Sequence, residues 1–224
     1  MQKFSEIAEI AEKRNGVEVM DRLVKTDLPK SSLELAAIPD DRWLAMATRC
    51  IFQAGFNWKV IDAKWPGFEE AFEGFDIGRW VLSTDDDLDA LVSDTRIVRN
   101  GQKIASVPIN ARFFAQISRE HGGVGKWVAD WPSTDEVGLL DALAKGGSRL
   151  GGATAQYFLR FMGKDAFLLS KDVMAALVRA GVIEKPATSK RALAAIQEAF
   201  NTWSAESGLG MTQISRTLAR SIDG

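Results

Sequence analysis

Two residue types that serve most protein metal sites are almost absent from this chain of 224 residues, which holds one cysteine, Cys50, and one histidine, His121. A single cysteine excludes a disulfide within the chain, and one cysteine with one histidine cannot build the four-ligand cage of a structural zinc. Gly122-Gly123 follow His121 and predict a helix C-terminus with a left-handed cap, so we assign His121 no catalytic role. The sequence therefore predicts no metal site and no mechanism that depends on a His triad.

Long apolar runs are missing as well. No stretch approaches the roughly 18 residues of a membrane-spanning helix. The first 16 residues mix acidic and basic side chains and lack the apolar stretch of a secretory signal. Hydrophobic residues make up 46% of the chain and charged residues 26%, as in soluble globular proteins. We therefore expect a cytoplasmic protein that makes no contact with membranes.

The net charge is only −2, but the charges are unevenly distributed. Residues 1–144 hold 17 Lys and Arg against 24 Asp and Glu, whereas residues 145–224 hold 11 against 6. Such separation can leave one basic face on a nearly neutral protein, although a solvated surface is the commoner explanation of a charge run. A second basic stretch lies inside the acidic part, at Arg96, Arg99, Lys103, Arg112, Arg119 and Lys126.

Strand patterns are rare, and apolar residues recur at three- and four-residue steps almost throughout the chain. We expect an all-α fold with about ten helices. Pro66-Gly67 should end one helix, and Pro108 should kink or break another. The expected helices cover about residues 4–15, 17–24, 43–52, 59–65, 68–72, 100–121, 136–143, 153–162, 170–180, 189–204 and 211–222, and a further helix is expected to open at Asp85.

Short polar residues mark the start of several of these helices. Asp40 or Asp41 can cap the helix that carries Trp43, and Ser83-Thr84 can cap the helix that follows them. Three aspartates at positions 85–87 then fall in a first helical turn, where the helix dipole favours acidic side chains. We interpret them as structural rather than as a metal site.

The glycine-rich sequence GGSRLGGATA, residues 146–155, is the first segment that indicates chemistry. Its four glycines allow positive φ angles and close approach to a ligand, and the amides that open the following helix would face an anion such as phosphate. No Gly-Lys-Ser/Thr ends the segment, so it is not a P-loop. A tight connection between two helices explains the glycine count equally well.

Aromatic side chains crowd the second segment, residues 42–76, around the turn Gln53-Ala54-Gly55. Phe52, Phe56, Trp58 and Trp65 all lie within twelve residues of this turn. Aromatic density beside a turn can stack a nucleic acid base. Packing in the protein core is the alternative, and it explains most aromatic residues at helical spacing.

Three segments, in the same order, resemble the DNA-3-methyladenine glycosylase I family of the helix-hairpin-helix DNA glycosylase superfamily. QAGFNWKVIDAKWPGFEEAFEGFD is similar to the family's QAGLSW segment and following helix, and DTRIVRNGQKIASVPINARFF to its IIRN–KI–NA segment. GGSRLGGATAQYFLRFMG and then LLSKDVMAALVRAGVI resemble the superfamily's hairpin and next helix. The resemblance covers about residues 40–183. It implies two helical lobes with a cleft between them, in a glycosylase-like domain over 41–224 after an N-terminal helical extension over 1–40.

The resemblance implies a monofunctional DNA glycosylase of base-excision repair, acting as a monomer on double-stranded DNA with alkylated bases. Such an enzyme hydrolyses the N-glycosidic bond of a flipped-out alkylated purine, here 3-methyladenine, whose positive charge makes it a good leaving group. Ala153 stands where bifunctional members carry a lysine, so no Schiff base is expected. The alternatives are a catalytically inactive DNA-binding protein that keeps the hairpin, and a helical protein-interaction domain.

Site residues follow from the resemblance position by position. Ser170 stands where many superfamily members have a catalytic Asp, and Asp172 is a candidate to orient water, although a first-turn acid is explained more simply by the helix dipole. The implied base pocket comprises Cys50, Gln53, Phe56 and Trp58, and the implied DNA-binding residues are Gly147, Arg149, Gly151, Gly152 and Thr154 of the hairpin with Arg96, Arg99 and Lys103.

The sequence also departs from the family. The family usually carries zinc on terminal Cys and His ligands, which this chain cannot supply, so we expect no cofactor. Cys50 replaces a glutamate that accepts a hydrogen bond from adenine, and a neutral thiol cannot do the work of that carboxylate. The residues before Arg42 do not match the family's N-terminal pattern, so its tyrosine-bearing pocket wall is missing too. Substrate choice or activity is therefore expected to differ.

Overall fold

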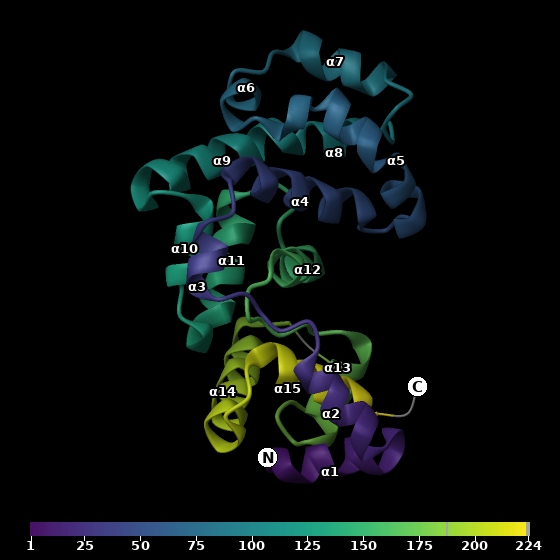
Figure 1. Ribbon diagram of the computed structural model, residues 1–224, viewed down its shortest axis with the longest axis vertical. Coiled ribbons are helices and arrows are strands. Elements are labelled where there is room, and N and C mark those ends of the chain that lie inside the picture. Colours follow the sequence, from purple (N-terminus) through teal and green to yellow (C-terminus); the bar gives the residue numbers. More distant parts are fainter. Residues whose placement is uncertain (187, 223–224) are drawn as a thin grey trace. The chain divides into compact units, whose positions relative to one another are not determined.

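A computed structural model describes residues 1–186 and 188–222, and every regular element in these residues is helical (Figure 1). The all-α prediction is confirmed. Fifteen α-helices and two 3₁₀ helices exceed the expected ten because single turns such as α3 (Ser32–Ala36), α6 (Ile77–Val81) and α8 (Gly101–Ile104) are too short to show a helical period. Among the described helices, none is long and apolar enough to span a bilayer.

The chain divides into two compact units. Unit 1 contains residues 1–30, 131–139 and 163–224, and unit 2 contains residues 31–130 and 140–162. The division falls inside α11 (Glu136–Gly146). The predicted division is a single cut, with an extension over 1–40 and a domain over 41–224, whereas each unit combines several stretches of the chain. The predicted division therefore stays a prediction.

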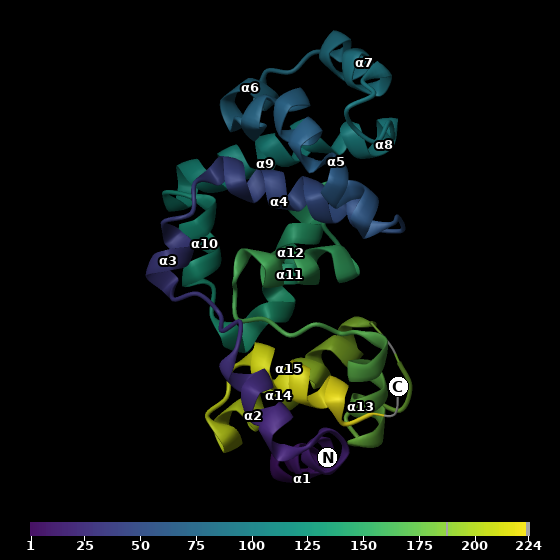
Figure 2. The ribbon, with the colours of Figure 1, turned by 45° about the vertical axis from the view of Figure 1, so that its right-hand side comes forward.

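Three helices form the centre of unit 2: α4 (Asp40–Gln53), α9 (Ser106–His121) and α12 (Gly152–Met162) (Figures 1 and 2). Trp43 of α4 meets Phe158 of α12 edge-on with ring centroids 5.7 Å apart, and Phe114 of α9 stacks on the same ring at 6.1 Å. All three side chains are fully buried. Aromatic burial of this kind fixes α12 firmly against α4.

The expected stop at Pro66-Gly67 is wrong, because α5 (Trp58–Ala71) runs straight through it. Proline inside a helix removes one hydrogen bond and costs about 3 kcal/mol. Burial offsets that cost, since Trp65 stacks on Phe68 at 5.3 Å and on Phe75 of η1 (Glu73–Phe75) at 5.6 Å. Tertiary packing here outweighs local propensity.

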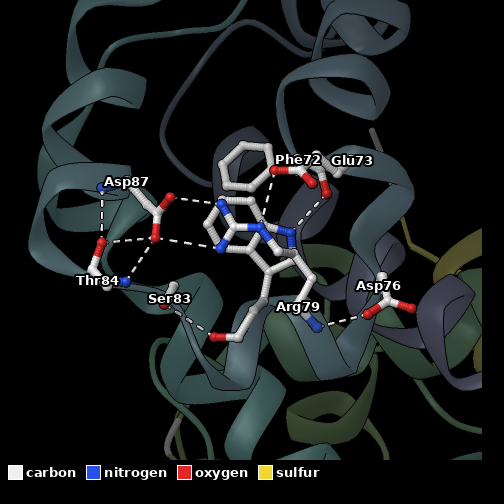
Figure 3. Close-up of polar contacts among 8 residues, drawn as sticks. Phe72, Glu73, Asp76, Arg79, Ser83, Thr84 and Asp87 are labelled. Atoms are coloured by element: carbon white, nitrogen blue, oxygen red, sulfur yellow. Dashed lines mark hydrogen bonds and ion pairs between the residues drawn. The ribbon is translucent and has the colours of Figure 1, made fainter.

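Arg79 ties the outer helices of unit 2 together (Figure 3). The guanidinium of this α6 residue donates to Asp87 of α7 (Asp85–Ser93) at 2.6 Å and to Glu73 at 3.1 Å. The predicted cap of α7 is confirmed, because the Thr84 hydroxyl accepts from the Asp87 amide while the Asp87 carboxylate accepts from the Thr84 amide. The aspartates at 85–87 thus open a helix, as expected.

Neither Asp40 nor Asp41 caps α4, whose N-cap position is Pro39. Asp40 instead accepts a hydrogen bond of 2.8 Å from the amide of Val124, the first residue of α10 (Val124–Asp130). The carboxylate therefore satisfies the start of a distant helix, which sequence spacing alone does not reveal. The break expected in residues 100–121 occurs at Ala105, so that Pro108 lies in the first turn of α9, where proline is tolerated.

Unit 1 contains the two N-terminal helices, α1 (Phe4–Asn15) and α2 (Val17–Lys25), packed on the last helix, α15 (Met211–Arg220). Gln213 and Arg216 of α15 each donate a 2.7 Å hydrogen bond to main-chain carbonyls at the end of α2. The remaining elements are η2 (Ser133–Asp135), α13 (Lys171–Arg179) and α14 (Lys190–Ser207).

Candidate functional site

The glycine-rich segment forms a hairpin between α11 and α12, and Asn110 of α9 holds it in place. The Asn110 side chain is fully buried. Its Oδ1 accepts from the Ser148 amide at 2.7 Å, and its Nδ2 donates to the Ser148 carbonyl at 3.1 Å. One side chain therefore satisfies both main-chain groups of the residue at the turn.

Geometry favours glycine at three hairpin positions, the first of which is Gly146, where a Cβ would overlap the Phe113 ring. A Cβ on Gly147 would lie 3.0 Å from the Leu143 carbonyl oxygen and 2.8 Å from a Leu150 methyl group, and Gly152 has a left-handed φ of +56°. Gly151 needs neither property, because its Cβ would make an ordinary 3.5 Å contact with Ala144. Arg149 itself adopts φ +60°, and its guanidinium donates to Gln102 of α8 at 2.6 Å.

A pocket of about 250 Å³ lies in unit 2 where the end of α4, the turn after it, the start of α5 and the start of α12 meet. It brings together four residues that the sequence analysis selected from two distant segments. Cys50, Gln53 and Trp58 come from the aromatic segment, and Thr154 comes from the hairpin. Ala54, Gly55, Ala153 and Tyr157 complete the lining.

Trp58 and Tyr157 form the aromatic wall of this pocket. Their ring centroids lie 5.1 Å apart at 83°, and Phe161 meets Trp58 at 5.9 Å and 81°. Sequence analysis missed Tyr157, although it is the one tyrosine in the chain and follows the hairpin directly. A tyrosine therefore lies in the pocket wall, on α12.

Phe56 does not line the pocket with the other predicted base-binding residues. It lies in the turn between α4 and α5, and 45% of its surface is exposed. Trp58 is 39% exposed, so an aromatic face of the pocket is open to a ligand from outside. Phe56 therefore lies outside the pocket lining, and its contact with a base stays a prediction.

The lining side chains of the pocket are uncharged. Burial raises the pKa of the Cys50 thiol to about 12, so it stays protonated at neutral pH. Gln53, which is 4% exposed, donates from Nε2 to Asp62 at 3.0 Å, whereas its Oε1 has no hydrogen-bond partner among the described residues. Asp62 in turn accepts from Arg49 at 2.8 Å.

The three basic residues expected to bind the DNA backbone have different surroundings. Arg96 pairs with Asp94 at 2.7 Å and with Glu70 at 3.4 Å. Lys103 donates to the main-chain carbonyls of Phe52 and Ala54, at the end of α4, so it supports the pocket wall. Burial, and then the charge of Arg149, lower the pKa of Lys103. Arg99 is exposed and makes no ion pair with any described residue.

Ser170 and Asp172, the proposed catalytic residues, belong to unit 1. Ser170 is the N-cap of α13, where its hydroxyl accepts from the Val173 amide at 3.3 Å, and Asp172 is exposed in the first turn. These local contacts match the expected helix start. Any role in chemistry stays a prediction for both residues.

The zinc of the family does not fit the donor set of this chain. Cys50 lines the pocket on α4, and His121 ends α9, where its ring lies 6.4 Å from that of Trp127. Within residues 1–186 and 188–222, no three His, Cys, Asp or Glu side chains gather in positions that would hold a metal ion.

Comparisons with known proteins agree with this architecture. The sequence model of the methyladenine glycosylase family matches residues 39–139, which include two of the three segments singled out above but not the hairpin. A crystal structure of 3-methyladenine DNA glycosylase I aligns with 61% of this chain and 82% of its own, at 20% identity and a TM-score of 0.50.

An 8-oxoguanine DNA glycosylase from Methanocaldococcus jannaschii aligns over 96% of this chain and 91% of its own, at 14% identity and a TM-score of 0.55. The same enzyme in complex with a 15mer DNA containing 8-oxoguanine aligns at 13% identity and a TM-score of 0.51, over 96% of this chain and 94% of its own. At such low identity, the structural alignments establish only a shared fold, which extends over nearly the whole chain. Residues 39–139 therefore match the methyladenine glycosylase family model, within a chain that has the fold of the helix-hairpin-helix DNA glycosylases.

Proposed function

We propose that the protein is a monofunctional DNA glycosylase that hydrolyses the N-glycosidic bond of an alkylated purine, with 3-methyladenine as the expected base. The observation that carries this proposal is the pocket itself. It joins Trp58 of the family-matched segment to Thr154 of the hairpin, so a base in the pocket and a phosphate at the hairpin would be bound by one rigid unit.

The chemistry asks little of the pocket. A flipped 3-methyladenine already carries positive charge, so its bond to C1′ breaks with the bonding electrons moving to the base, and water then adds at C1′ and releases one proton to the solvent. Trp58 supplies an aromatic face for the base, and the hairpin amides and Arg149 are suited to a backbone phosphate. Ala153 offers no amine for attack on C1′, which supports hydrolysis rather than lyase chemistry.

Release of free base from methylated duplex DNA, followed by chromatography, tests this proposal. Trp58→Ala should lower the rate about tenfold or more, because stacking on an aromatic side chain contributes about 1–3 kcal/mol per base. Val60→Ala is the matched control, since Val60 lies on the same helix, is exposed and does not line the pocket. Equal release by the Trp58 and Val60 variants would remove Trp58 from the base site.

A second candidate is a DNA-binding protein without catalytic activity. The neutral Cys50 favours it, because this position lacks the carboxylate that the resemblance leads one to expect. This candidate predicts salt-dependent binding to duplex DNA, weakened by Arg149→Glu, with no base released. Release of base by the unmodified protein would exclude it, and release only by Cys50→Glu would favour it.

A further inference from the structure

The pocket contains one buried hydrogen-bond acceptor that the protein itself does not use. We propose that Oε1 of Gln53 recognises the bound base by accepting a hydrogen bond from its exocyclic amine. Gln53 would then be the specificity-determining residue of this pocket, in place of a carboxylate. This inference rests on the proposed function and names the chemistry by which the site selects an aminopurine.

Burial without a partner is the first argument. Gln53 lines the pocket and is 4% exposed, yet its Oε1 accepts no hydrogen bond from any described residue. A buried polar atom in this state is costly, and a ligand that donates to it removes the cost. An unpaired acceptor at this position therefore favours a ligand that carries a hydrogen-bond donor.

The orientation of the amide is the second argument. Nε2 of Gln53 donates to Oδ1 of Asp62 at 3.0 Å, and a flipped amide would instead place two acceptor oxygens together. Arg49 donates to the same Asp62 oxygen from Nη2 at 2.8 Å and from Nε at 3.2 Å, which keeps that carboxylate in place. The chain Arg49–Asp62–Gln53 thus fixes which end of the amide is left for a ligand.

The rest of the lining gives the third argument. Cys50, Ala54, Gly55 and Ala153 present a thiol or apolar groups, while Thr154 and Tyr157 carry hydroxyls that can donate as well as accept. Gln53 alone among the lining side chains offers an acceptor whose donor end is already occupied. Since the Gln53 amide is neutral, it can accept a hydrogen bond from the exocyclic amine of a base whether or not the base is positively charged.

Oε1 is covered in the empty pocket, so the proposal includes a small displacement of the wall when a base binds. Base-on-aromatic stacking against Trp58 can drive such an adjustment. The exocyclic amine of the bound base then donates to Oε1, and this hydrogen bond stabilises the displaced wall.

Binding of two free bases to the intact protein tests the assignment, with quenching of tryptophan fluorescence as the readout. The probes are 3-methyladenine and 3-methylpurine, which lacks the 6-amino group. We expect the wild-type protein to bind 3-methyladenine about tenfold more tightly, a ratio that corresponds to about 1.4 kcal/mol. Gln53→Met, of similar length but without an acceptor, should reduce this ratio to about one.

Cys50→Ala is the matched control, because it changes the same helix and the same wall without removing an amide. It should alter both affinities by the same factor and leave the ratio intact. A general disturbance of the pocket in Gln53→Met would likewise weaken both bases equally, so retention of the ratio in that variant overturns the proposal. Equal binding of both bases by the wild-type protein, or binding of neither, also overturns it.

The free-base measurement separates this inference from the proposed function. A protein that discriminates the two bases through Gln53 but releases none from methylated DNA would support the recognition and contradict the enzyme. Release of base together with an unchanged ratio in Gln53→Met would support the enzyme and contradict the recognition.

Discussion

Asn110 shows how much of the hairpin depends on a single side chain. It is fully buried and bonds both the amide and the carbonyl of Ser148, the residue before the left-handed Arg149. The amides that open α12, which we propose to face a DNA phosphate, follow within a few residues. The shape of the hairpin is therefore set from α9, a helix of the family-matched segment.

We predict that Asn110→Ala destabilises the protein by about 2–4 kcal/mol, because two buried main-chain groups lose their partner. It should also weaken binding to duplex DNA. Urea unfolding and fluorescence anisotropy with labelled duplex measure the two effects. Asn110→Asp keeps the acceptor for the Ser148 amide but places a buried carboxylate oxygen against the Ser148 carbonyl, so it should not recover the lost stability. Unchanged stability in the alanine variant would contradict this account.

The base pocket illustrates what residue-level reasoning can and cannot find. Cys50, Gln53 and Trp58 were predicted as base-pocket residues and Thr154 as a DNA-binding residue of the hairpin, and the structure places all four in one lining. Tyr157 was missed because its place in the wall depends on how α12 packs on α4 through Phe158 and Trp43. The spacing of residues around Tyr157 in the sequence does not reveal this contact between helices.

At the scale of elements, caps and breaks were predicted well where the partner is close in sequence. Thr84 caps α7 as expected, through a residue three positions on. Predictions of helix ends and caps failed where contacts with an element distant in sequence determine the local structure. Pro66 stays inside α5 because of aromatic burial, and Asp40 serves the start of α10, which is 84 residues away.

Close packing of α3 on α10 depends on Gly125. A Cβ at this position would overlap the carbonyl oxygen of Leu35, a main-chain atom that cannot move independently of α3. We predict that Gly125→Ala costs about 1–3 kcal/mol, the usual penalty for overpacking. Gly101→Ala is the control, because its Cβ would lie 3.7 Å from a Val92 methyl group. Thermal unfolding of both variants measures the difference, and equal melting temperatures would contradict it.

The contact between α6 and α7 makes stability depend on pH (Figure 3). Hydrogen bonds from Arg79, and then from Thr84, hold the pKa of Asp87 well below its usual range. A depressed carboxyl pKa contributes stability above the unfolded value of about 4, and this contribution is lost as the pH falls through the lower folded value.

Asp87→Asn should therefore lower the melting temperature at pH 7 and narrow its gap to the wild-type protein as the pH falls below about 4. Asparagine keeps an acceptor for the Thr84 amide and removes the ion pair with Arg79. The comparison isolates Asp87, since the other carboxylates titrate in both proteins. A gap that stays constant from pH 7 to pH 2.5 would show that the ion pair contributes nothing.

At the scale of the whole molecule, uneven charge can leave a basic face, but two of the basic side chains in the stretch from Arg96 to Lys126 are used internally. Arg96 pairs with two carboxylates, and Lys103 supports the end of α4. The amino-acid composition gives the number of charged side chains, but it does not show with which groups each of them pairs. Arg149 and Arg99 keep exposed side chains in unit 2 and are the better candidates for the DNA backbone.

The N-terminal helices have a structural role in unit 1. Apolar residues of α1, including Phe4, Ile7 and Ala11, are buried in the same unit as α15, whose Gln213 and Arg216 bond the end of α2. Sequence periodicity predicted both helices but could not identify what they cover, because α15 lies about 200 residues away.

We predict that Ile7→Ala costs about 2–5 kcal/mol, as expected for truncating a fully buried side chain. Val17→Ala, at a position 64% exposed on α2, should change stability by less than about 0.5 kcal/mol. Limited proteolysis with mass spectrometry shows where the effect falls: new cleavage sites in the Ile7 variant should lie in residues 163–222 of unit 1, while α4, α9 and α12 stay protected. Because α1 belongs to unit 1, early cleavage of those three helices would mean that it stabilises the pocket-bearing unit as well.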